Sequence, residues 1–265
     1  MKKRIIIILL LAFICSSHEF WLNPEKFFYQ KGETATVLLQ VGENFEGSPW
    51  KGTILRLGLF QPLGEEKPIN VEIDTNRRSI KVPLAQEGTN ILVLQNKPSK
   101  IELEAEKFNA YLKEDGLEEI LAYRKQNGLE NTSGREIYER CAKLLFKVGK
   151  MHDKNFSRMT NLPLEIVPLN NPYAGDLEKQ KSRKVYFKVY FQGKPVANLS
   201  VKFWQKFGNE LLKQEAKTSK YGEVTFEFLT KGKIMISAVK MIPHTKPEEA
   251  DWHSYWASLV FGYTN

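Results

Sequence analysis

Short runs of alternating apolar and polar residues fill the chain between residues 34 and 105. Ile80, Val82 and Leu84, for example, flank the polar Lys81 at a spacing of two. This period is typical of strands with one buried face, and the turn-forming residues between the runs indicate an antiparallel sandwich. The predicted strands are 34–41, 53–60, 69–74, 79–84, 90–95 and 100–104.

The period of the apolar residues changes after residue 105. Within 108–123, and again within 133–148, apolar residues recur at the spacing of a helix face. Ser133 and Glu136 have the spacing of a capping box, and Gly149 is placed to end the second helix. These patterns predict a helical insertion at 106–150 that contains two helices.

Strand-like runs return after residue 163. Gly193, Gly222 and Gly232, with apolar residues such as Val201 and Phe226 between them, form a spaced series that resembles transthyretin-like and immunoglobulin-type modules. We therefore predict a mainly β fold with two immunoglobulin- or transthyretin-like β-sandwich regions, residues 18–105 and 151–265, separated by the helical pair. The predicted strands of the second region are 164–168, 184–191, 199–207, 223–229, 233–240 and 254–263.

The first 17 residues predict a signal peptide. Three basic residues, 2–4, precede an apolar run at 5–14, and the small residues 15–17 follow it. The apolar run is about half as long as the roughly 20 residues that a membrane-spanning helix needs, and no second such run follows. We expect cleavage before His18 and export to the periplasm or cell envelope. Lipid anchoring through Cys15 is the alternative, although Ile14 is a poor residue for the position before a lipidated cysteine.

Charge and cysteine content exclude several classes of protein. Loss of three basic residues with the signal leaves 36 Lys and Arg against 31 Asp and Glu, so the net charge falls from +8 to +5. There is no basic run, so we predict no nucleic-acid partner. Cys141 is then the only cysteine, which excludes an internal disulfide, and its apolar neighbours indicate a buried structural residue. The sequence has no hydrolase motif such as G-x-S-x-G or H-E-x-x-H.

A terminal histidine would be a metal chelator in its own right. If cleavage makes His18 the N-terminus, its α-amino nitrogen and imidazole Nδ1 can bind one metal ion together, and such nitrogen ligands suit Ni, Co, Cu and Zn. Glu19 could add a carboxylate oxygen. His253 and His244, near the loop that precedes the last strand, are the favoured partners because loops of sandwiches commonly carry sites. The tryptophans near both ends of the mature chain are interpreted as packing residues.

Several motifs together resemble a known family. They are the mature start His-Glu-Phe-Trp-Leu at 18–22, the segment Val-Gly-Glu-Asn-Phe at 41–45, the segment 111–117, the Arg-Glu-x-Tyr-x-Arg pattern at 135–140, the segment 164–168, and Asp-Trp-His-Ser-Tyr-Trp-Ala-Ser-Leu at 251–259. The chain resembles a family of poorly characterised exported bacterial proteins, a domain of unknown function, often described as the periplasmic component of cobalt or nickel uptake systems. This resemblance implies handling of a divalent transition metal.

These observations predict an exported binding protein, not an enzyme, that captures a divalent metal for a membrane transporter. Two alternatives from other classes remain. One is a structural or adhesive module of the cell envelope without metal, which the second sandwich region would suit. The other is a copper oxygenase with a histidine brace, which would need a second chelating histidine and a polymer-binding face.

Overall fold

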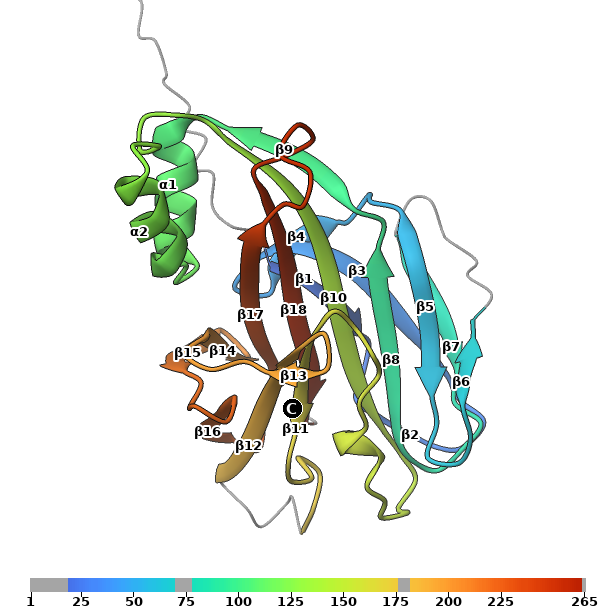
Figure 1. Cartoon of the computed structure of the whole chain (residues 1–265). Coiled ribbons are helices and arrows are strands. Elements are labelled where there is room, and N and C mark those ends of the chain that lie inside the picture. The colour runs from blue at the N-terminus through green and yellow to red at the C-terminus, as the bar shows by residue number, and fades with distance from the viewer. Residues whose placement is uncertain (1–18, 70–77, 176–181, 264–265) are drawn as a thin grey trace, which may run out of the picture.

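The computed structural model describes residues 19–69, 78–175 and 182–263. The signal peptide, Cys15 and His18 lie outside these ranges, as does most of the strand predicted at 69–74. Within them the chain forms a large central sheet, two smaller sheets and a pair of helices (Figure 1). The predicted class, mainly β with two sandwich regions and a helical pair between them in sequence, is confirmed. Neither helix in the described ranges approaches the length or apolar character of a membrane span.

The central sheet has ten strands within the described residues, in the order β15-β14-β17-β18-β10-β8-β5-β6, with β2 and β9 also paired to β10. Both halves of the chain contribute to it, and β10 and β18 join the halves as parallel neighbours. The bounds are Phe28–Tyr29 (β2), Ile54–Phe60 (β5), Glu66–Pro68 (β6), Gly88–Asn96 (β8), Ser99–Leu103 (β9), Gly134–Val148 (β10), Ser200–Phe207 (β14), Glu210–Lys217 (β15), Lys233–Pro243 (β17) and Trp252–Gly262 (β18).

Two smaller sheets cover opposite faces of the central sheet. One contains Glu19–Pro24 (β1), Thr34–Glu43 (β3), Glu46–Pro49 (β4) and Ser79–Pro83 (β7); the other contains Leu164–Pro168 (β11), Ser182–Phe191 (β12), Lys194–Pro195 (β13) and Glu223–Leu229 (β16). Strand β8 shows the two faces directly. Leu92 and Leu94 pack in the core under the β1 sheet, whereas Ile91 and Val93 pack in the core under the β11 sheet. The two sandwich regions therefore share one sheet.

The helical pair lies beside the ends of β10 and β17 (Figure 1). Helix α1 (Ala105–Glu114) and helix α2 (Glu118–Gln126) both overlap the first predicted helical stretch, 108–123, and a three-residue break separates them. Gly116 in this break has φ +66°, a conformation that suits glycine and ends α1. Phe108, Leu112 and Ile120 form a small core with side chains of β17 and β18.

The second predicted helix, over 133–148, is wrong. This segment is the strand β10, and its last eight residues are all buried because the central sheet is covered on both faces. A strand buried on both faces has a nearly continuous apolar run, in which helical spacings occur without a helix. Cys141 is buried as predicted, but in a strand.

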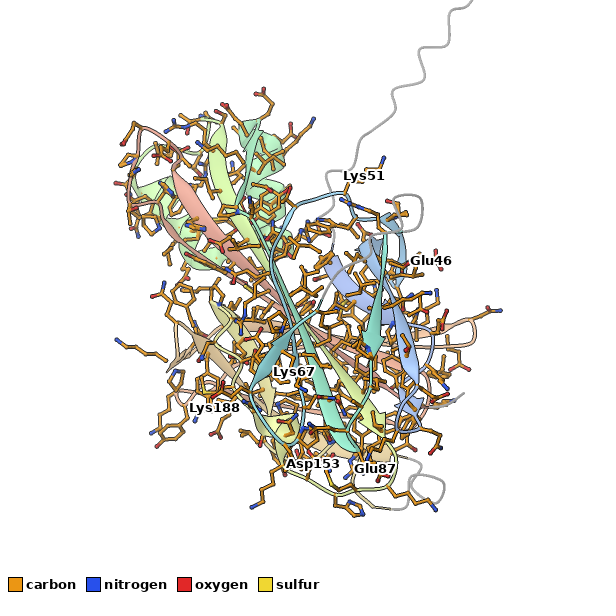
Figure 2. The ribbon with its side chains drawn as sticks, turned by 90° about the vertical axis from the view of Figure 1, so that its right-hand side faces the viewer. Glu46, Lys51, Lys67, Glu87, Asp153 and Lys188 are labelled. Carbon is orange, nitrogen blue, oxygen red and sulfur yellow. The ribbon has the colours of Figure 1, made fainter. Side chains whose placement is uncertain are left out.

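Polar side chains fix the chain where β10 leaves the central sheet. Asp153 accepts a hydrogen bond from the backbone N–H of Thr89 (2.7 Å) and another from that of Asn155 (2.7 Å). Figure 2 shows Asp153 near Glu87 at this end of the molecule. A short 3₁₀ turn, Asn155–Ser157, follows and leads to β11. These contacts connect the first sandwich region to the second.

Candidate functional site

Glu19 is the first described residue and begins β1 opposite Gly42 of β3. Its side chain is buried, and Oε1 accepts a hydrogen bond from Ser237 Oγ on β17 (2.9 Å). Burial raises the pKa of this carboxyl to about 7, although Lys202 and Arg140 nearby oppose the rise. The second residue of the predicted mature chain, Glu19, is therefore held between two sheets.

A group of charged and polar side chains surrounds Glu19 where β1, the central sheet and α1 meet. We call it the junction cluster. Lys202 on β14 forms an ion pair with Asp115, at the end of α1, with 2.7 Å between Nζ and Oδ1. This pair ties the helix to the sheet. The junction cluster consists of Glu19, Tyr111, Asp115, Glu136, Arg140, Lys202, Ser237, Ser254 and Trp256.

Glu136 is the second buried carboxylate of the junction cluster. Its Oε1 accepts hydrogen bonds from Tyr111 Oη (3.2 Å) and from Ser254 Oγ. The hydroxyl oxygen of Ser254 in turn accepts one from Trp256 Nε1 (2.9 Å). Burial raises the pKa of Glu136 to about 7, because these neutral donors only partly replace water around the charge.

Arg140 lies between the two carboxylates on the same face of β10 as Glu136. Its guanidinium is 5.7 Å from the ring centre of Phe20 and 5.9 Å from that of Trp256. Its charge lowers the pKa of Glu19, and Glu136 in turn favours the charged form of Arg140. The junction cluster can therefore take up and release protons near neutral pH.

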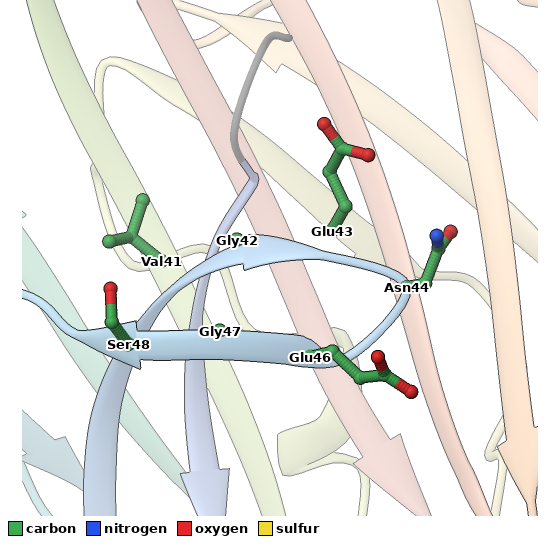
Figure 3. Close-up of a pocket in the computed structure, with 7 residues that line it drawn as sticks. All are labelled: Val41, Gly42, Glu43, Asn44, Glu46, Gly47 and Ser48. Carbon is green, nitrogen blue, oxygen red and sulfur yellow. The ribbon is translucent and has the colours of Figure 1, made fainter. Parts of the chain in front are cut away.

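The hairpin between β3 and β4 lies where the chain enters β1. Residues 41–44 and 46–48 line a hollow of about 450 Å³ there (Figure 3). Glu43 Oε1 and Asn44 Oδ1 are shielded from solvent and have no hydrogen-bond partner within the described residues. Glu46 on the same hairpin is different, because its carboxylate forms an ion pair with Lys206 (2.7 Å). The hairpin thus has two shielded oxygen acceptors and one satisfied carboxylate.

The structure brings His253 and His244 together, with their ring centres 5.7 Å apart. His253 Nε2 lies 2.9 Å from Glu139 Oε1, and the His253 ring stacks on Tyr255 at 4.4 Å. His244 Nδ1 accepts a hydrogen bond from the backbone N–H of Lys246 (3.1 Å).

Glu19 and His253 point to opposite faces of the central sheet. Ser237, which binds Glu19, pairs with Ser258 of β18, so both side chains share a face. His253 is five positions from Ser258 and therefore faces the other way. The predicted ligands Glu19 and His253 do not share a site. Within the described residues, no group of three or more His, Cys, Asp or Glu side chains is arranged to hold a metal ion.

The sequence interpretation missed most of the junction cluster. Tyr111, Asp115, Glu136, Arg140 and Lys202 come from three separate elements, and no short motif connects them. The sequence feature that could have pointed to the junction cluster is the presence of charged residues within otherwise apolar strands such as β10. Trp21 and Trp252 are both buried and belong to hydrophobic cores, as the packing interpretation predicts.

Comparisons with known proteins place the chain in a family but assign no activity. No curated protein matches it. Among solved structures, it is similar to an Escherichia coli alpha-2-macroglobulin activated by porcine elastase, with 10% identity and a TM-score of 0.26 over 93% of this chain and 20% of that one. A DUF4785 family protein from Legionella pneumophila gives 11% identity and a TM-score of 0.26, over 82% of this chain and 50% of that one.

The D0-D1 domain of Intimin gives 13% identity and a TM-score of 0.24, over 93% of this chain and all of that one. The chain thus spans about a fifth of the length of the alpha-2-macroglobulin and about half of that of the DUF4785 family protein. Likenesses this weak support no argument about fold or function. The sequence profile of one family matches residues 15–241, which is most of the chain, and the protein therefore belongs to the family described as a domain of unknown function, DUF4198.

Proposed function

We propose that this protein is an exported binding protein that captures a divalent transition metal at its mature N-terminus. One observation carries the proposal: Glu43 Oε1 and Asn44 Oδ1 are shielded from water and unpartnered where the chain enters β1. A buried acceptor without a partner costs stability, and a cation or a cationic donor removes that cost. Both atoms are acceptors, which favours a positively charged ligand.

His18 would supply the nitrogen ligands for this metal. It precedes Glu19 by one peptide bond, and Glu19 is held by its pairing with Gly42 and by Ser237. With a free α-amino group, His18 offers two nitrogens to one ion, and Glu43 and Asn44 offer oxygens. Ni, Co, Cu and Zn accept such mixed ligands. Glu19 itself serves as an anchor for the strand, since its Oε1 is already hydrogen-bonded. Because no three-ligand group exists among the described residues, the proposal depends on His18.

The proposed role is capture and delivery, and the acceptor is a membrane transporter component, as the family resemblance implies. His253 and His244 would not take part in this site because they lie on the other face of the central sheet. A role in binding agrees with the hairpin hollow, which residues of β3 and β4 line close to the start of β1 (Figure 3).

The test is metal binding by the protein exported through its own signal. We expect an intact mass that begins at His18 and one tightly bound Ni, Co, Cu or Zn ion in native mass spectrometry. His18→Ala, or a glycine inserted before His18, should weaken binding at least about tenfold in calorimetry, and Glu43→Gln should also weaken it. Glu46→Gln is the matched control and should bind as the wild type does. Equal affinity of the wild type and His18→Ala would overturn the proposal.

A further inference from the structure

A second hollow, separate from the junction cluster and the hairpin, lies between the helical pair and the loop that joins β17 to β18. Its volume is about 470 Å³, which falls within the range of small-molecule sites. We call it the helix pocket. The side chains that matter for its chemistry are Tyr123, Arg124, Arg135, His244, Asp251 and Trp252.

Arg124, on α2, is the fixed group of the helix pocket. The side chain is 1% exposed, and its guanidinium lies 4.9 Å from the ring centre of Phe108. Nε donates to Asn109 Oδ1 (3.0 Å), and Nη2 donates to the carbonyl oxygens of Leu129 (2.7 Å) and Thr132 (2.6 Å). All three acceptors are neutral. Within the described residues, Nη1 makes no hydrogen bond.

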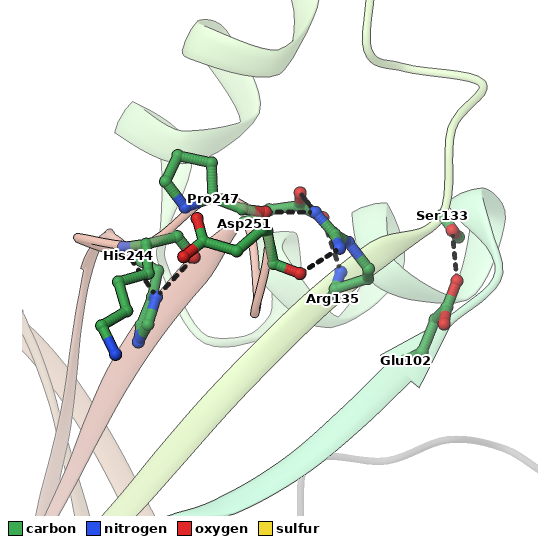
Figure 4. A network of polar contacts seen from close by, with 8 residues as sticks. Glu102, Ser133, Arg135, His244, Pro247 and Asp251 are labelled. Atoms are coloured by element: carbon green, nitrogen blue, oxygen red, sulfur yellow. Dashed lines mark hydrogen bonds and ion pairs between the residues drawn. The ribbon is translucent and has the colours of Figure 1, made fainter.

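The one carboxylate of the helix pocket is already matched by another arginine (Figure 4). Asp251 Oδ1 lies 2.7 Å from Arg135 Nη2, and Oδ2 accepts from Arg135 Nε (3.3 Å) and from its backbone N–H (2.9 Å). Burial favours the neutral acid, but these hydrogen bonds hold the pKa of Asp251 below its usual range. Asp251 therefore stays charged and neutralises Arg135. Arg124 makes no ion pair within the described residues, although the charge of Asp251 acts on it from farther away and favours its charged form.

Two large aromatic side chains, Tyr123 and Trp252, form part of the wall of the helix pocket. Tyr123 is 47% exposed and meets Trp252 edge to face, with ring centres 5.4 Å apart. Trp252 also carries an unused donor, because its Nε1 is shielded from solvent and has no acceptor within the described residues. The helix pocket thus combines a desolvated cation, a spare N–H donor and flat apolar surfaces.

We propose that the helix pocket binds a small organic carboxylate with a flat apolar body. The carboxylate would accept hydrogen bonds from Arg124 Nη1 and neutralise its charge, and the apolar body would lie against Tyr123 and Trp252. A rigid arginine suits this ligand, because its hydrogen bonds to Asn109, Leu129 and Thr132 already hold it in place and little side-chain entropy is lost on binding. A neutral ligand of the same shape would give Arg124 Nη1 a weaker acceptor than a carboxylate does. This site is independent of the proposed metal site.

The test uses benzoate as the probe and benzamide, its neutral analogue, as the matched ligand. In proton–nitrogen NMR titrations of the full mature protein, we expect saturable binding of benzoate, with a shift of the Trp252 indole N–H signal. Benzamide should bind about tenfold or more weakly, because it lacks the charge. Equal affinity for the two probes, or no saturable shift with benzoate, would overturn the proposal.

Two variants locate the site. Arg124→Gln should abolish the preference for benzoate over benzamide. Arg124 also holds the loop after α2, so circular dichroism is used to check that the Arg124→Gln variant is folded. Tyr123→Ala is a second test of the site, at a half-exposed position that leaves the core intact. Tyr123→Ala should weaken benzoate binding severalfold. Tyr221→Ala, at a 59% exposed tyrosine outside the helix pocket, is the control and should change nothing. Unchanged benzoate affinity in Tyr123→Ala would contradict the proposed site.

Discussion

Two buried groups of charges lie on opposite faces of β10 and differ in how their charges are matched. Lys143 faces the β11 sheet and pairs with Glu165, with 2.7 Å between Nζ and Oε1 and each side chain 1% exposed. Glu165 Oε1 also accepts from the backbone N–H and the hydroxyl of Thr160. On the other face, Glu136 in the junction cluster accepts from the neutral donors Tyr111 and Ser254.

The difference in partners gives the Lys143–Glu165 pair a structural role and lets Glu136 exchange protons. A buried carboxylate that is hydrogen-bonded to a buried lysine holds two sheets together, since neither charge is stable in the core alone. A buried carboxylate with only neutral partners takes up a proton near neutral pH, as the raised pKa of Glu136 indicates. One strand thus carries a structural ion pair on one face and a titratable group on the other.

The largest expected effect follows from breaking the structural pair. Lys143→Met leaves Glu165 buried without its cation, and we expect a loss of about 3–5 kcal/mol in the free energy of unfolding. Urea denaturation followed by tryptophan fluorescence measures this loss. The double variant Lys143→Met with Glu165→Leu removes both charges and should recover most of it. A cost of Lys143→Met below about 1 kcal/mol would show that the pair is not structural.

The second effect is the pH dependence that Glu136 gives to stability. Its pKa is raised to about 7 in the folded protein from the usual value of 4.5, so between these pH values the folded state binds more protons than the unfolded state. Stability from this group is therefore present below pH 4.5 and declines as the pH rises to about 7, by a total of about 3 kcal/mol. Tyr111, Asp115 and Arg140 are the charged or titratable groups that face it.

Glu136→Gln removes this titration but keeps an acceptor for Tyr111 and Ser254. Relative to the wild type, the variant should gain stability as the pH rises from 4.5 to 7, which urea unfolding at several pH values measures. Glu118→Gln, at an exposed carboxylate, is the control and should follow the wild-type curve. A constant difference between Glu136→Gln and the wild type across this range would show that Glu136 is ionised throughout.

The smallest effect is expected at an exposed pair between a helix and the edge of the central sheet. Lys217 and Glu118 are 48% and 60% exposed, with 3.4 Å between their charged atoms. Solvent screens such pairs, so Lys217→Ala should change the free energy of unfolding by no more than about 0.5 kcal/mol in urea titrations. A larger loss would mean that burial of the charged groups does not determine the relative size of the stability changes at Lys143, Glu136 and Lys217.

Local pattern was a good guide wherever a strand has one face toward a core and turns at its ends. Strands β3, β5, β7, β11, β12, β14 and β16 lie at or within a few residues of their predicted positions. The strand β15 was missed because its residues are mostly exposed and polar, so no apolar alternation marks it. The segment that became β10 was predicted as a helix, since a fully buried strand and a buried helix share an apolar sequence.

The candidate sites depended even more on tertiary structure. Glu19 and the histidines 244 and 253 were singled out from the sequence, and the fold placed Glu19 on one face of β18 and His253 on the other. The sequence could not show this separation, because it follows from the register between β17 and β18. The helix pocket likewise depends on Arg124 and on the adjacent residues Asp251 and Trp252, which are far from Arg124 in the chain and meet it only in the fold.

By itself, the sequence determined the mainly β class, the position of most strands, the break to helices after residue 105 and the family to which the chain belongs. These depend on local periodicity, turn residues and short motifs, which each segment carries independently of the rest. Tertiary structure decided that the two sandwich regions share one sheet, that β10 is a strand, and which charges are buried together. Those outcomes depend on which sheet packs on each face of the central sheet. Burial of a strand on both faces follows from the packing of all three sheets and is not a property of its own segment.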